Sequence, residues 1–106
     1  MKYQIKRQKK SLVVILKDLS VDLSLIPLQL DDNYRHLILD LSEFSEFSKE
    51  KLKNFTNFGN KVVRKNSFVI ICQVDFSKDF QIVPSLQEAF DLIQLEEIEQ
   101  QLDLEI

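Results

Sequence analysis

Short apolar runs of strand length recur along the chain, separated by polar turns. The first run alternates with polar residues, as a half-exposed strand does, whereas the later runs are nearly continuous, which is typical of strands buried on both faces. A polar stretch at 8–10 between the first two runs predicts an opening hairpin. The predicted strands centre on 3–5, 12–16, 37–41, 68–72 and a short segment at 82–83.

A helix is predicted from Ser48 onward, because a serine hydroxyl can accept the free backbone N–H groups of a first turn. Apolar residues then recur at three- and four-residue steps, which builds one stripe flanked by lysines and asparagines. The stripe consists of Leu52, Phe55, Phe58 and Val62. Gly59, the only glycine, falls on the same face, where either a close approach of the helix backbone to a strand or an early helix end accounts for it.

The carboxy-terminal segment predicts a longer helix with two separate apolar faces. Ser85 and Glu88 form a complete capping-box pattern at its start. At ~100° per residue, the early apolar set lies roughly half a turn from the later one. The early set is Leu86, Ala89, Phe90 and Ile93, and the later set is Leu92, Leu95, Ile98 and Leu102. One face can pack against the sheet, and the other is available to a partner.

The element order predicts the α/β fold class. Pro27 interrupts the apolar segment 21–30, so only a short or broken helix fits there. The full order is then strand, strand, short helix, strand, helix, strand, short strand, helix. A chain of 106 residues supports one core, so we expect a single domain over 1–106. Its predicted architecture is a central mixed sheet of four to five strands covered by two main helices and a short one.

Composition places the chain among ordinary soluble proteins, with 44% apolar and 29% charged residues. No apolar run of the sequence approaches the ~20 residues that a membrane helix needs. The amino terminus is basic but lacks the apolar core and cleavage site of a secretory signal, which predicts a cytoplasmic protein. Cys72, the only cysteine, lies in an apolar run, in keeping with a reducing compartment.

Charge is divided between the two ends of the chain. Residues 1–17 hold six Lys or Arg and no acid, whereas residues 85–106 hold seven Asp or Glu and no base. Phosphate binding needs a contiguous basic face, and an acidic chain of net charge -3 without an interleaved aromatic platform argues against nucleic acid. Basic residues on an edge strand also discourage edge-to-edge pairing, which is the structural interpretation of the same pattern.

No combination of residues predicts catalysis, a metal or a cofactor. His36 is the only histidine and begins a strand, so we interpret it as structural. One histidine and one cysteine cannot supply a zinc site of ordinary spacing, and a single glycine cannot build a phosphate-binding loop. Asp40 and Glu43 resemble a carboxylate pair, but charges at a strand end usually face solvent or cap a turn.

Two parts of the sequence, together with the element order, resemble a known family. They are 36–42, His-Leu-Ile-Leu-Asp-Leu-Ser, and the closing segment 82–93 with 96–99. They are similar to the central strand and to the closing strand and helix of the STAS domain, the fold of anti-sigma factor antagonists. The resemblance is closer to short bacterial STAS-like proteins of uncharacterised role, some labelled ribonuclease Z. The chain has no metal-binding motif that such an activity requires.

The resemblance breaks at the family's regulatory motif. STAS antagonists carry Asp-Ser-Ser-Gly at the start of the helix after the central strand, and a partner kinase phosphorylates one serine. The equivalent position here reads Ser48-Lys-Glu-Lys51, with Glu50 in place of the phosphorylated serine. Glu50 is either an ordinary first-turn acid or a permanent phosphate mimic, and both are favourable at a helix N-terminus. The segment 74–80 is also too short for the helix that usually precedes the family's last strand.

We therefore expect a non-enzymatic protein-interaction or regulatory module of the bacterial cytoplasm. Its partner-binding residues would include Ser48 and Glu50. Phe44 and Phe47, which precede the first long helix, either tuck under its start as a hydrophobic staple or serve as exposed anchors. The alternative is a small accessory subunit of a nucleic-acid-processing enzyme such as a ribonuclease, bound through the basic amino-terminal strands.

The later stripe of the last helix predicts self-association, as a homodimer, or docking to another protein. Its residues Leu95, Ile98 and Leu102 cannot face the same core as Phe90 and Ile93 unless the helix kinks, and no proline or glycine is there to cause a kink. Acidic neighbours would repel each other between two paired copies of the helix. The same charges favour docking on the basic hairpin of a neighbouring molecule.

Overall fold

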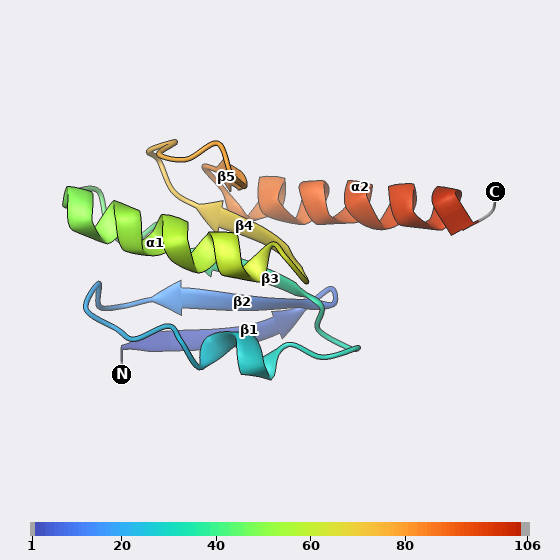
Figure 1. Ribbon diagram of the computed structural model, residues 1–106, viewed down its shortest axis with the longest axis horizontal. Helices are drawn as coiled ribbons and strands as arrows, with labels where there is room; N and C mark the ends of the chain where they lie inside the picture. Colours follow the sequence, from blue (N-terminus) through green and yellow to red (C-terminus); the bar gives the residue numbers. More distant parts are fainter. Residues whose placement is uncertain (1, 105–106) are drawn as a thin grey trace.

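Five strands form one mixed sheet whose spatial order follows their order in the chain (Figure 1). The computed structural model describes the backbone of residues 2–104 and the side chains of residues 2–98. The first pair of strands is antiparallel and the remaining pairs are parallel. The strands are β1 (Tyr3–Gln8), β2 (Ser11–Leu16), β3 (His36–Asp40), β4 (Ser67–Ile71) and β5 (Gln81–Val83). The predicted α/β class and mixed sheet are confirmed.

Helices occur where the sequence predicted them. The β2–β3 connection contains only a 3-10 helix, η1 (Ile26–Gln29), with Pro27 in its first turn, where proline is tolerated; a helix running through Pro27 from residue 21 would place it in the interior, where it breaks the helix. Helix α1 (Lys49–Val62) connects β3 to β4, and helix α2 (Leu86–Leu104) follows β5. The segment 72–80 between β4 and β5 contains no helix, as its length indicated.

Alternate residues of each central strand face opposite sides of the sheet, so the protein has two apolar layers. One layer lies under α1 and η1, and the other lies under the first half of α2. The layer under α1 contains Leu12, Val14, Leu37, Leu39, Phe68 and Ile70 with Phe55, Val62 and Ile26. The layer under α2 contains Val13, Ile38, Val69 and Ile71 with Ala89, Phe90 and Ile93.

The start of α1 is fixed by a polar cap and an aromatic contact. The backbone N–H of Lys51 donates to Ser48 Oγ at 3.2 Å, which confirms Ser48 as the N-cap. The Phe47 ring meets Phe55 edge to face, with centroids 6.3 Å apart, and Phe44 packs edge to face on Phe47. Both rings are half-buried against the core, so they tuck under the helix start.

Gly59 lets α1 approach two aromatic rings. A Cβ atom at this position would lie 2.6 Å from the Phe68 ring and closer still to the Phe80 ring. Of the two explanations that the sequence left open, close approach holds, and the neighbours are aromatic side chains rather than strand backbone. The helix continues for a further turn to Val62.

The hairpin turn between β1 and β2 carries backbone strain that the sequence did not indicate. Lys9 and Lys10 have φ values of 50° and 63°, in the left-handed region that favours glycine or asparagine. Two consecutive left-handed residues make the tight turn whose twist matches that of the flanking strands. The turn brings both lysines to the edge of the sheet from which the parallel strands start.

Helix α2 begins on the sheet and ends beyond it. The Glu88 N–H donates to Ser85 Oγ at 3.3 Å, which confirms the predicted N-cap. Ala89, Phe90 and Ile93 are buried, but Leu86 is 36% exposed, so its assignment to the buried face was wrong. The remaining length of α2 extends past the edge of the sheet, and the end of the helix at Leu104 lies far from the body of the domain (Figure 1).

Candidate functional site

The outer face of α2, defined by Leu95 and Ile98, is apolar and exposed. Leu95 is 57% exposed and Ile98 is 45% exposed, although both are large aliphatic side chains. Leu92, predicted to belong to the same stripe, is instead half-buried at the margin of the core. The predicted third member, Leu102, lies on the helix, but its side chain is outside the described residues.

The two faces of α2 diverge without a break in the helix. A single α-helix runs from Leu86 to Leu104, so no kink turns the second half back onto the sheet. The buried side chain of Ile93 and the exposed side chain of Leu95 are separated by two positions, or ~200° around the cylinder. The outer face therefore points away from the protein's own core.

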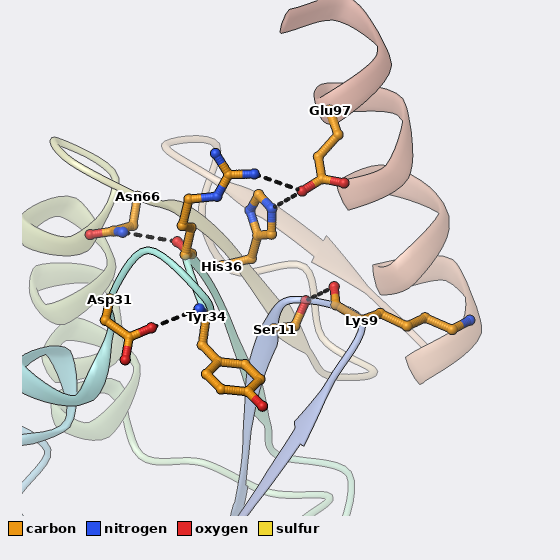
Figure 2. Close-up of polar contacts among 8 residues, drawn as sticks. Lys9, Ser11, Asp31, Tyr34, His36, Asn66 and Glu97 are labelled. Carbon is orange, nitrogen blue, oxygen red and sulfur yellow. Dashed lines mark hydrogen bonds and ion pairs between the residues drawn. The ribbon is translucent and has the colours of Figure 1, made fainter. Parts of the chain in front are cut away.

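A polar cluster attaches α2 to the start of β3 (Figure 2). His36 Nε2 lies 2.9 Å from Glu97 Oε1, and the histidine side chain is 4% exposed. Arg35 donates to the same carboxylate oxygen at 3.2 Å. The hydrogen bond from His36 lowers the pKa of Glu97, with further lowering by the charges of Lys10 and Arg35, while partial burial opposes the shift. This cluster, His36, Arg35 and Glu97, holds α2 in place where the helix leaves the sheet.

The polar cluster extends to the end of α1. The side-chain amide of Asn66 donates to the backbone carbonyl of Arg35 at 2.8 Å, so the segment after α1 is tied to the entrance of β3. His36 Nδ1 is buried and has no hydrogen-bond partner within the described part of the chain. Among the described residues, Glu97 is the one hydrogen-bond partner of the imidazole ring.

The hairpin turn contacts α2 within the same molecule. Lys9 Nζ lies 4.8 Å from the centroid of the Phe90 ring, within the range of a cation–π interaction. Lys9 and Lys10 line a shallow depression together with Asp91 and Glu97. The sequence suggested that acidic residues of the last helix dock on the basic hairpin of a neighbouring molecule. Within one chain, acidic residues of α2 already lie beside the lysines of the hairpin tip.

The residues predicted at the regulatory position lie on the surface at the start of α1. Glu50 is exposed in the first turn, where a carboxylate interacts favourably with the helix dipole. Ser48 is exposed and its oxygen accepts the capping hydrogen bond. The structure brings Phe44 and Phe47 together with this helix start, on the face opposite α2. The outer face of α2 and the α1 start are separate surfaces.

The remaining candidate residues have ordinary structural partners. Asp40 Oδ1 accepts from the Ser42 N–H at 2.8 Å, and Glu43 forms an ion pair with Lys17. In the described portion of the protein, no three His, Cys, Asp or Glu side chains gather where they could hold a metal ion. Over the same portion, no helix is long and apolar enough to span a membrane.

The Glu97 cluster is the contact at this site that sequence reasoning missed. His36 and Glu97 are 61 positions apart, and an acidic helix offers several equivalent carboxylates, so no local pattern selects this one. Helical geometry offers a weak signal, because Glu97 falls four residues after Ile93 and thus on the buried face. Only the packing of α2 across β3 identifies the partner.

Comparison of the chain with protein-family models, curated proteins and solved structures finds no match. The resemblance to the STAS domain therefore rests on the residues of the central strand and closing helix, and on the element order.

Proposed function

We propose that the protein is a non-enzymatic interaction module that binds another protein through the outer face of α2. The observation that carries this proposal is the exposure of Leu95 and Ile98 on a helix that extends beyond the sheet. Two adjacent exposed aliphatic side chains gain free energy when a partner covers them, at about 25 cal/mol per Å² of apolar surface. Single exposed leucines are common, but a pair aligned on a projecting helix fits the helix-in-groove mode of recognition.

The attachment of α2 to the sheet supports this mode of binding. One side of the helix is buried through Ala89, Phe90 and Ile93. The hydrogen bond between Glu97 and His36 attaches the helix to β3 at a position next to Ile98 of the outer face. A helix held in its bound conformation loses less conformational entropy on association than a flexible segment does. The polar cluster would thus present Leu95 and Ile98 in a preformed geometry.

We further propose a regulatory role similar to that of an anti-sigma factor antagonist, without the phosphorylation switch. In the family the switch is a serine at the start of the helix after the central strand, and here an exposed Glu50 occupies that region. A fixed carboxylate supplies part of the charge of a phosphate at all times. Binding would then depend on the amount of protein and partner rather than on a kinase.

The alternative, an accessory subunit of a nucleic-acid enzyme, is less well supported by the arrangement of basic residues. Lys6 pairs with Val13 and Arg7 pairs with Leu12, so their side chains leave opposite faces of the sheet. Arg7 donates to Gln29 at 3.1 Å. A protein surface that binds the phosphate backbone of a nucleic acid needs its cations on one side. Filter binding to RNA tests the alternative, since phosphate contacts would weaken steeply between low and moderate salt.

A capture experiment tests the proposed function. The intact protein, tagged on its amino terminus, is compared with Leu95→Asp/Ile98→Asp for proteins retained from a bacterial lysate and identified by mass spectrometry. We expect one specific partner to be lost with this variant. The matched control is Leu25→Asp/Val74→Asp, which places the same charges at two exposed aliphatic positions elsewhere. Equal capture by all three proteins would contradict binding through α2.

A further inference from the structure

A groove lies on the opposite side of the sheet from α2, between α1 and the segment around η1. Its volume is about 580 Å³. Its floor is apolar, because buried and half-buried side chains from both walls reach the surface there. The floor residues are Val21, Leu23, Phe55, Phe58 and Val62. The proposed binding through α2 does not use this groove.

The rim of the groove is basic along its α1 side. Lys51, Lys61 and Lys65 line it, and Asp22 is the single acid among the lining residues. The Asp22 carboxylate is engaged locally, since its Oδ1 accepts from the Ser24 N–H at 2.9 Å. On the η1 side the rim continues with Leu28, whose side chain is 79% exposed. An apolar floor bordered by lysines and a leucine suits an acidic amphipathic helix.

The chain itself contains such a helix. The outer face of α2 has the two exposed aliphatic residues Leu95 and Ile98, and the helix sequence from 86 to 104 contains acids and no Lys or Arg. The lengths also agree. Leu95 to Leu104 is nine steps, or about 14 Å of helix, and the groove borders α1 from Lys51 to Val62, eleven steps or about 17 Å.

We propose that the groove between α1 and η1 binds α2 of a second copy of this chain. The inference rests on the proposed binding through the outer face of α2 and specifies its occupant. Pairing of two α2 helices would place acidic residues against acidic residues. The hairpin tip is a weaker acceptor, since Lys9 already contacts Phe90 of its own α2. The lysine-lined groove is the surface whose charge and apolar floor both complement the helix.

Binding of this kind is head to tail, because the helix of one copy meets the groove of the next. A head-to-tail contact leaves one helix and one groove free at the ends, so it builds closed rings or open chains rather than a two-fold dimer. The contact also brings carboxylates close to lysines, and its strength should therefore fall as salt rises. These two properties distinguish it from a symmetric helix pair.

A complementation experiment tests the proposal by sedimentation velocity. Leu95→Asp/Ile98→Asp removes the helix surface and keeps the groove, whereas Lys61→Glu/Lys65→Glu reverses the charge of two of the three rim lysines and keeps the helix. Both changes fall on exposed positions, so the variants should fold, which circular dichroism checks. We expect the unaltered protein to self-associate and each variant alone to weaken association at least about tenfold. An equimolar mixture should form a one-to-one dimer that does not grow further.

The matched control is Lys49→Glu/Lys53→Glu, which reverses two exposed charges on the same helix away from the groove and should leave association unchanged. Self-association of Lys61→Glu/Lys65→Glu at the level of the unaltered protein would overturn the proposal, as would failure of the two variants to associate when mixed. A monomer up to about 1 mM would also overturn it. If that monomer still captured a partner that Leu95→Asp/Ile98→Asp loses, the proposed function would stand with a different occupant.

Discussion

Replacement of Glu97 by alanine should destabilise the protein more than the same change at Glu88, Asp91 or Glu96, the other acidic residues of α2 whose side chains the structure describes. The carboxylate accepts hydrogen bonds from His36 at 2.9 Å and from Arg35 at 3.2 Å. Because the histidine ring is buried and its Nδ1 is already without a partner, Glu97→Ala leaves both ring nitrogens unpaired among the described contacts.

The expected magnitude follows from the burial of the two partners. A buried polar group that loses its hydrogen-bond partner costs about 1–3 kcal/mol. The Arg35 side chain is largely exposed, so its ion pair adds at most about 1 kcal/mol. We expect Glu97→Ala to lower the free energy of unfolding by about 2 kcal/mol, which corresponds to a decrease of about 8–10 °C in Tm for a domain of this size. Glu97→Gln keeps an acceptor oxygen and should lose about half as much.

Urea unfolding followed by circular dichroism measures these changes, since the chain has no tryptophan. The pH dependence gives a second test. The pKa of Glu97 is lowered from its ordinary value of 4.5 by the hydrogen bond from His36, so its stabilisation is complete above that value and is lost as pH falls through the lower, folded-state value. The difference between the unaltered protein and Glu97→Gln should therefore be largest near neutral pH and shrink in acid.

The control is Glu96→Gln, which removes an adjacent charge that makes no hydrogen bond or ion pair within residues 2–98. It should change stability by less than about 0.5 kcal/mol. The reasoning would be refuted if the free energy of unfolding of Glu97→Ala lay within about 0.5 kcal/mol of that of the unaltered protein, which is the range typical of ordinary surface changes. Equal losses for Glu97→Ala and Glu96→Gln would refute it too.

Three further predictions concern other parts of the fold. Gly59→Ala should lower the free energy of unfolding, measured with urea, by about 1 kcal/mol or more. Overpacking against the Phe68 ring should outweigh the ~1 kcal/mol that alanine gains in helix propensity, and a stabilised variant would contradict this. Lys10→Gly should raise the free energy of unfolding by about 0.5–1 kcal/mol, because glycine adopts the left-handed conformation of this position without strain. A lower free energy of unfolding would argue against strain in the turn. Incubation with a kinase of ordinary STAS antagonists should leave Ser48 unmodified by mass spectrometry, and Glu50→Ala should cost no more than about 1 kcal/mol; stoichiometric phosphorylation of Ser48 would disprove the loss of the switch.

Local patterns in the sequence were sufficient to predict the order of the elements and the starts of the two long helices. Ser48 and Ser85 cap α1 and α2 as predicted, because capping depends on hydrogen bonds between residues three positions apart. The runs at 12–16 and 37–41 became buried parallel strands, because strands covered on both faces need apolar side chains at every position. The exposure of Leu95 was also predictable, since helical periodicity places it opposite Ile93.

Contacts between residues distant in the sequence were decided only by the tertiary structure. The contact of Glu97 with His36 requires α2 to cross the start of β3 at one register; helical periodicity places Glu97 on the buried face of α2, but the position of α2 on the sheet is set by tertiary packing. The groove between α1 and η1 exists only because the two segments cover the same face of the sheet while leaving a gap between them. The left-handed turn at Lys9 escapes sequence reasoning for a related reason: pairing of β1 with β2 imposes a backbone conformation that lysine itself disfavours.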